Sequence, residues 1–164
     1  MTNRFTYTHD SLIGADGKYN AFNCIHAASK MLKGRGLTNQ SINKAMDALK
    51  GLNQCTGMKG MESLVFVPVF DRDLTENSTG ITELADYFNC PVLDVMMYYS
   101  YLADLEKNGY LTSENGIFCS LLKRKYRVNT KVLEAIIQGK ELNKKSEPEK
   151  RRFKDQFDFC RAVS

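Results

Sequence analysis

Apolar side chains recur along this 164-residue chain three and four positions apart, the spacing of one face of an α-helix. The first such stripe contains Ala21, Ile25, Ala28 and Leu32, and glycines at 34 and 36 follow it. Comparable stripes, each bounded by a capping residue, a glycine or a proline, follow farther along. The pattern predicts helices over residues 18–33, 38–52, 81–88, 92–108 and 132–137.

Three stretches depart from this spacing and indicate strands. Residues 64–67 (LVFV) combine β-branched and aromatic side chains, and Pro68 would confine such a strand to the edge of a sheet. Residues 110–112 and 117–128 lie on either side of a turn with the sequence SENG. A strand, a turn and a second strand predict a hairpin.

The order of these elements indicates a fold class. A tight turn at residues 89–91 joins the helices over 81–88 and 92–108, which is the arrangement of a helix-turn-helix. A hairpin directly after such a pair is the wing of a winged helix. We therefore expect a mainly α protein with a small β-sheet, folded as a winged helix-turn-helix with an additional N-terminal helix.

The same pattern predicts the domain organisation. Residues 1–17 form an N-terminal arm, residues 18–140 the winged-helix domain, and residues 141–164 a linker and the start of a helix. That last helix opens with a capping box at 146–149 (SEPE) and carries Phe153 and Phe157 on one stripe. We expect the stripe to lead into a downstream domain or, alternatively, to pack back on residues 1–60.

The formal net charge of +4 hides an uneven distribution. Residues 1–60 carry eight Lys and Arg against three acids, residues 61–104 one against eight, and residues 105–164 fourteen against eight. A uniformly basic binding surface is therefore excluded. An acidic middle between two basic flanks is the pattern to explain, and packing of oppositely charged faces together with ordinary solubility would account for it without a function.

The residues that most enzymes need are missing from the sequence. It contains no CxxC or HExxH motif and no phosphate-binding GxxxxGK[ST] loop, and its two histidines are His9 and His26. We expect a non-enzymatic protein with no catalytic residue, cofactor or metal. The sequence also has no signal peptide and no long apolar run, so we expect cytoplasmic localisation with the five cysteines as reduced thiols.

The outward face of the predicted 92–108 helix favours a protein partner. A helical wheel places Leu93, Met97, Tyr101 and Asp104 outward, with Asp94 at the margin. Exposed Met and Tyr are typical of protein interfaces, whereas carboxylates repel phosphates. These four residues are the predicted protein-binding surface, unless residues 1–60 cover Met97 and Tyr101.

The predicted wing has the opposite charge. Lys123, Arg124, Lys125 and Arg127 place four basic residues within five positions, and Lys131 follows. Such a run can hold a nucleic-acid backbone without reading its sequence. A DNA-binding winged helix that uses these five residues is therefore the alternative function, and any nucleic-acid binding should be weak and salt-sensitive. A solvated hairpin end would explain the same run without a function.

Residues 81–140 resemble a module that precedes the ATPase domain in certain bacterial AAA-family ATPases, especially of the Bacteroidetes kind. The resemblance rests on 84–91 (LADYFNCP), Leu102, 105–111 (LEKNGYL), 126–128 (YRV) and 132–136 (VLEAI). It implies a non-catalytic N-terminal module that recruits a substrate or adaptor protein, or that holds subunits together. Its partner would be such a protein or a downstream ATPase module of the same polypeptide. The family's nucleotide-binding motifs match nothing here, so no ATP-site residue is carried over.

Overall fold

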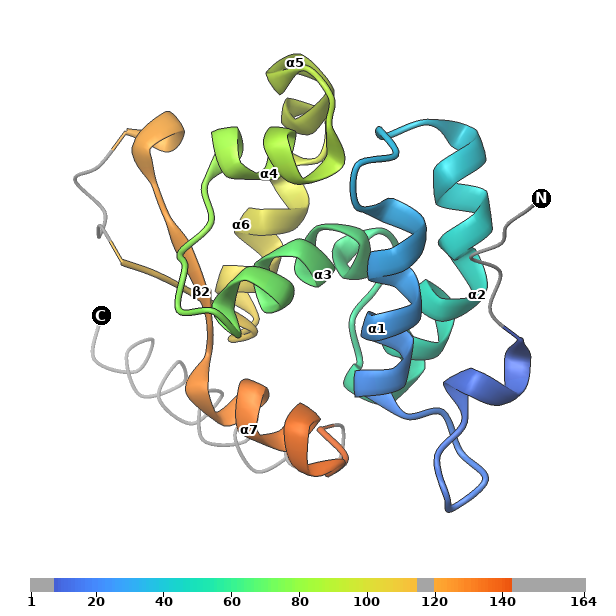
Figure 1. Ribbon diagram of the computed structural model, residues 1–164. Coiled ribbons are helices and arrows are strands. Elements are labelled where there is room, and N and C mark those ends of the chain that lie inside the picture. Colours follow the sequence, from blue (N-terminus) through green and yellow to red (C-terminus); the bar gives the residue numbers. More distant parts are fainter. Residues whose placement is uncertain (1–7, 115–119, 143–164) are drawn as a thin grey trace, which may run out of the picture.

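The computed structural model describes residues 8–114 and 120–142, and Figure 1 shows their arrangement. Helices α1 (Ala21–Leu32) and α2 (Asn39–Thr56) pack against each other, as the apolar stripes predict. Their close approach depends on Gly51, because a Cβ there would lie 2.7 Å from the ring of Tyr19 and 2.9 Å from the Cys24 sulfur. The α1–α2 pair forms one side of the molecule.

Helix α3 (Glu62–Asp73) lies at the centre and contacts α1, α2, α4, α6 and β2. The predicted strand over 64–67 is therefore wrong, because these residues form the first half of a helix that includes Pro68. Every residue from Glu62 to Phe70 is buried, so the helix is apolar on all sides and lacks the stripe that identifies a surface helix.

Of the two helices predicted around residues 89–91, the first is present and the second is interrupted. Helix α4 (Ile81–Phe88) ends at Asn89, which adopts a left-handed conformation with φ 59°. The single helix predicted over 92–108 is instead two, α5 (Val92–Met96) and α6 (Tyr99–Lys107). The interruption changes which side chains share a face, as described below.

The sheet is small and antiparallel. Strands β1 (Leu111–Ser113) and β2 (Tyr126–Val128) pair with Leu111 opposite Val128, which confirms a hairpin at this place. The strand predicted over 117–128 is shorter than expected, because residues 121–123 form a 3₁₀ turn, η2 (Leu121–Lys123). Residue Thr79 forms an isolated bridge with Tyr126 on the other edge of β2. The mainly helical class with a small sheet is confirmed.

The chain on either side of these elements also packs on them. A 3₁₀ turn, η1 (His9–Leu12), buries Leu12 completely in the core, although residues 1–17 were expected to form an arm. Helix α7 (Thr130–Gln138) begins after the side chain of Asn129 accepts a hydrogen bond from Lys131 N–H, and ends at Gly139. The predicted helix after Ser146 lies outside the described residues.

Candidate functional site

Three large apolar side chains are exposed on α5 and at its C-cap, and we call Val92, Leu93 and Met97 the α5 patch. Leu93 is 80% exposed, Met97 79% and Val92 38%. Leu93 and Met97 are four positions apart and so share one side, while Val95 is buried and attaches the other side to the core. Such exposed apolar side chains, adjacent on one short helix, indicate a contact surface.

The structure separates the four residues predicted to form the protein-binding face. Leu93 and Met97 are exposed together, and Asp104 is exposed on α6. Tyr101 is half-buried against the core, with its ring centroid 6.2 Å from that of Tyr98. Tyr101 therefore supports the α6 packing and lies outside the α5 patch.

The interruption between α5 and α6 explains this difference from the helical wheel. The Tyr98 N–H donates to the carbonyl of Val95 at 2.9 Å, and the Tyr101 N–H to the carbonyl of Tyr98 at 3.1 Å. Both bonds reach three residues back instead of the four of an α-helix, which tightens the chain and shifts the register. Residues after Tyr98 no longer continue the face of Leu93 and Met97.

Two exposed carboxylates lie on α5 and on α4, the helix packed against it. No Lys or Arg occurs in the sequence between Arg72 and Lys107. The side chains of Asp86 on α4 and Asp94 on α5 are exposed, and neither forms an ion pair with any residue that the structure describes. This end of the molecule therefore combines apolar and negative character.

The basic run predicted to contact phosphates is largely occupied by carboxylates of the same chain. Lys125 pairs with Glu83 at 2.7 Å, Arg124 with Glu106 at 3.7 Å, and Arg127 with Asp73 at 2.5 Å. Lys123 is exposed on η2, and Lys131 is exposed on α7. The structure thus does not bring the five residues together as one positive surface.

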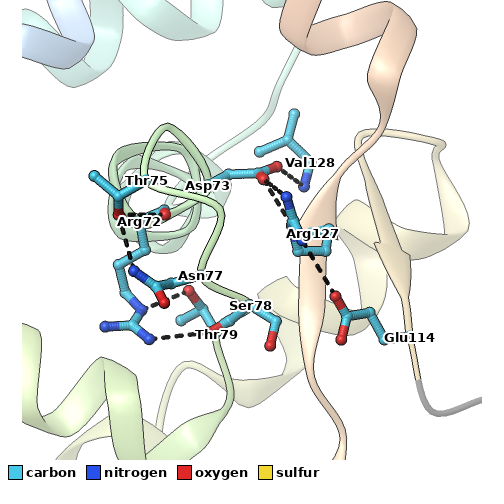
Figure 2. A network of polar contacts seen from close by, with 9 residues as sticks. All are labelled: Arg72, Asp73, Thr75, Asn77, Ser78, Thr79, Glu114, Arg127 and Val128. Carbon is cyan, nitrogen blue, oxygen red and sulfur yellow. Dashed lines mark hydrogen bonds and ion pairs between the residues drawn. The ribbon is translucent and has the colours of Figure 1, made fainter.

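Asp73, at the end of α3, is the most buried member of these pairs (Figure 2). Its side chain is 3% exposed, accepts the backbone N–H of Val128 at 2.8 Å and accepts Arg127 Nε at 2.6 Å. The hydrogen bond to Asp73 raises the pKa of the Arg127 guanidinium, which also lies 3.4 Å from Glu114. One carboxylate therefore fastens β2 to the central helix.

Arg72, next to Asp73 on α3, forms hydrogen bonds with the residues that precede α4. Its Nε donates to Thr79 Oγ1 at 2.9 Å and its terminal nitrogen donates to the carbonyl of Ser78 at 3.0 Å (Figure 2). The segment 61–104 also supplies the acids Glu83 and Asp73, which pair with Lys125 and Arg127. For these pairs, the uneven charge is explained by packing of oppositely charged faces.

Glu83 forms the polar contact between α4 and β2. It accepts the Gly80 N–H at 2.9 Å, which caps α4, and Lys125 Nζ at 2.7 Å. Partial burial by itself would raise the pKa of the Glu83 carboxyl, but these two hydrogen bonds and the lysine charge outweigh burial and lower that pKa. The ionised carboxylate is therefore the form that the fold favours.

This contact should make stability pH-dependent. The ordinary pKa is 4.5 and the folded value is lower, so the contribution is complete above 4.5 and is lost as the pH falls through the folded value. In Lys125→Met the pKa of Glu83 should move back toward 4.5. We expect the difference in unfolding free energy between wild type and variant, measured by urea titration, to shrink from about pH 6 to about pH 3. A difference that is constant over this range would contradict the assignment.

Metal-ligating side chains do not cluster in the part of the chain that the structure describes. The described residues contain no cluster of three or more His, Cys, Asp or Glu residues that could hold a metal ion. An open cavity of about 550 Å³ is lined by His9, Lys18, Cys55 and Glu141, among others. Burial, followed by the charges of Asp16 and Glu141, raises the pKa of Cys55 to about 11, so its thiol stays protonated near neutral pH and is a poor nucleophile.

Sequence reasoning missed part of this site. Val92 was assigned no role, and Leu121 and Leu122 were placed in a strand although they are 48% and 62% exposed. The carboxylate partners of the wing were not named either. The acidic block over 61–104 was the available signal for them, because a charge surplus of this size next to a basic segment indicates pairing.

Comparison of the chain with protein-family models, with curated proteins and with solved structures gives no match. The resemblance of residues 81–140 to AAA-associated modules therefore stays a prediction from the residues alone. Among the residues that the structure describes, no helix has the length and apolar character to cross a membrane.

Proposed function

We propose that this chain is a non-catalytic winged-helix module that recognises a protein partner through the α5 patch. The observation that carries the proposal is the exposure of Leu93 and Met97, about four fifths each, on the helix that follows the turn. Burying one such side chain in an interface gains about 1.5–3 kcal/mol. A few residues carry most of the binding energy of a protein interface, and Met is among the residue types enriched in interfaces.

The order of elements supports the winged-helix assignment. Helix α3 is followed by Thr79, α4, the α5–α6 pair, β1 and β2. Thr79 N–H donates to the Tyr126 carbonyl at 3.0 Å, and Tyr126 N–H donates to the Thr79 carbonyl at 2.9 Å. Strand β2 thus has β1 on one edge and Thr79 on the other. We assign the first strand of the winged helix to Thr79 instead of residues 64–67.

The alternative, a DNA-binding wing, is less well supported. Arg124, Lys125 and Arg127 would have to leave Glu106, Glu83 and Asp73 before binding phosphates, and each exchange removes a contact within the fold. On the helix that would enter the major groove, Asp94 and Asp104 are exposed where base-reading residues are usually Arg, Lys, Asn or Gln.

Within this proposal, the resemblance to AAA-associated modules suggests the kind of partner. The chain would act as the N-terminal module of a AAA-family ATPase and bind either a protein on which the ATPase acts or the downstream ATPase module. It would assist assembly or recruitment and leave ATP hydrolysis to that other module. This part of the proposal rests only on the residues quoted for the resemblance.

The test is site-specific photo-crosslinking in the cell that makes the protein. A photo-reactive amino acid is placed at Leu93 or, as the control, at Gln138, which is exposed on α7 at the far end of the molecule (Figure 1). We expect position 93 alone to yield a discrete adduct with one protein. That protein, purified, should bind the wild-type chain and bind the Met97→Glu variant at least tenfold more weakly. Equal adducts from both positions, or none from 93, would overturn the proposal.

DNA binding should be weak and without sequence preference. Lys123 and Lys131 form no ion pair with a described residue, so replacing both by Gln should reduce the slope of log affinity against log salt by about two. Arg124→Gln should leave that slope unchanged, because Arg124 pairs with Glu106. Fluorescence anisotropy with duplexes of different sequence is the measurement. Submicromolar affinity for one duplex, a hundredfold above a scrambled one, would restore the DNA-binding function.

A further inference from the structure

The exposed apolar side chains gather at one end of the molecule. Of eight large hydrophobic residues exposed in the described part, five belong to the α5 patch or to η2. In η2 these are Leu121 and Leu122. Helix α4 contacts both α5 and η2 and lies between them (Figure 1). The contact surface therefore extends beyond α5 and has two apolar parts.

The two ends of α4 lie next to the two parts of the surface. A Cβ at Gly80, before its first residue, would lie 3.0 Å from the carbonyl of Arg124, directly after η2. The α5 patch begins four residues after Phe88, the last residue of α4. Eight helical residues span about 12 Å. A partner helix with apolar side chains two turns apart, at positions i and i+7, presents them over a comparable length.

The surface between the two parts is polar and negative. The exposed residues of α4 include Thr82, Asp86 and Asn89 at its C-terminal end, and Asp94 continues the negative character onto α5. Neighbouring cations are engaged with the fold: Lys125 pairs with Glu83, and Lys33 lies over the ring of Tyr87, 5.5 Å from its centroid. Lys123, beside Leu122, is exposed at the edge of η2. The carboxylates of Asp86 and Asp94 are thus exposed on α5 and on the end of α4 that precedes it.

We propose that the occupant of this surface is a basic amphipathic helix of the partner protein. Its apolar residues would pack on the α5 patch and on Leu121 and Leu122, and its Lys or Arg side chains would face Asp86 and Asp94. This inference rests on the proposed function and adds the chemistry of the partner. The apolar contacts supply the affinity, while the carboxylates select against acidic helices.

The test uses three synthetic 18-residue peptides and the full chain. The first carries leucines at i, i+3, i+4 and i+7 flanked by lysines, the second has the same leucines flanked by glutamates, and the third has the composition of the first in scrambled order. Fluorescence anisotropy should show the first peptide binding at least tenfold more tightly than either of the others. Equal binding of the basic and acidic peptides, or of the ordered and scrambled ones, would overturn the inference.

Variants locate the binding. Leu93→Ser with Met97→Ser, and separately Leu121→Ser with Leu122→Ser, should each weaken binding of the first peptide at least tenfold. Asp86→Asn with Asp94→Asn should reduce the preference for lysine over glutamate flanks. The control is Ile137→Ser, an equally apolar and 53% exposed residue on α7, which should change nothing. If Ile137→Ser weakens peptide binding as much as either double variant does, the peptide does not bind at the α5 patch and η2.

Failure of this inference can be told from failure of the proposed function. If the protein cross-linked at position 93 binds through an acidic or a non-helical segment, the α5 patch remains a recognition surface and the basic-helix inference is wrong. If position 93 yields no specific adduct, both the proposed function and the basic-helix inference are wrong.

Discussion

Replacing Asp73 by alanine is expected to destabilise the protein by about 1–3 kcal/mol, because it leaves a buried backbone N–H without its hydrogen-bond acceptor. The change would leave the backbone N–H of Val128 without its acceptor and Arg127 without its closest carboxylate. Strand β2 would lose its attachment to α3, the central helix. Urea unfolding monitored by circular dichroism gives the difference in free energy.

Two further variants identify the source of that loss. Asp73→Asn keeps an oxygen that can accept from Val128 but removes the charge, so it should cost less than the alanine change. Arg127→Met leaves the buried carboxylate with its backbone donor alone. If Asp73→Ala costs under about 1 kcal/mol, the value typical of an exposed ion pair, then Asp73 does not organise the wing.

The fold was predictable where a helix has one apolar side. The helices over residues 18–33, 38–52, 81–88 and 132–137 all occur within a few residues of those bounds, because each buries one stripe and ends at a glycine or at Asn89. Helix α3 was not recognised, since its burial on every side removes the periodic signal and its β-branched residues resemble a strand. Composition alone cannot distinguish a helix that is buried on every side from a buried strand.

The site was predictable in part, for a related reason. Leu93 lies on α5 and Met97 at its C-cap, and both are exposed as expected, because Met97 still has helical backbone angles and so keeps the helical spacing from Leu93. Tyr101 was misplaced because the wheel assumed that the helix continues through Tyr98. The pairing of Arg127 with Asp73 joins residues 54 positions apart, and only tertiary structure specifies such a contact. Charge blocks indicated that pairing would occur but not between which residues.

Phe66→Ala should have the other large effect, about 3–5 kcal/mol for a fully buried ring. Phe66 is 0% exposed, lies 6.0 Å from the ring of Phe70, and belongs to the helix that contacts both the α1–α2 pair and the α6–β2 side. Because both sides share α3, we expect a single unfolding transition in the wild type and in the variant. Hydrogen exchange of the amides of α1 and β2 should accelerate together.

The matched control is Phe22→Ala, the same change at a ring that is 39% exposed on α1 and meets Phe70 edge-on at 6.2 Å. Less of this ring is buried, so Phe22→Ala should lower the free energy of unfolding by only about 1 kcal/mol. If Phe66→Ala instead separates unfolding into two transitions, with α1 protected while β2 exchanges freely, then the α1–α2 pair folds independently. Residues 18–140 would then be two cooperative units, and the α5 patch could be disrupted without unfolding the N-terminal helices.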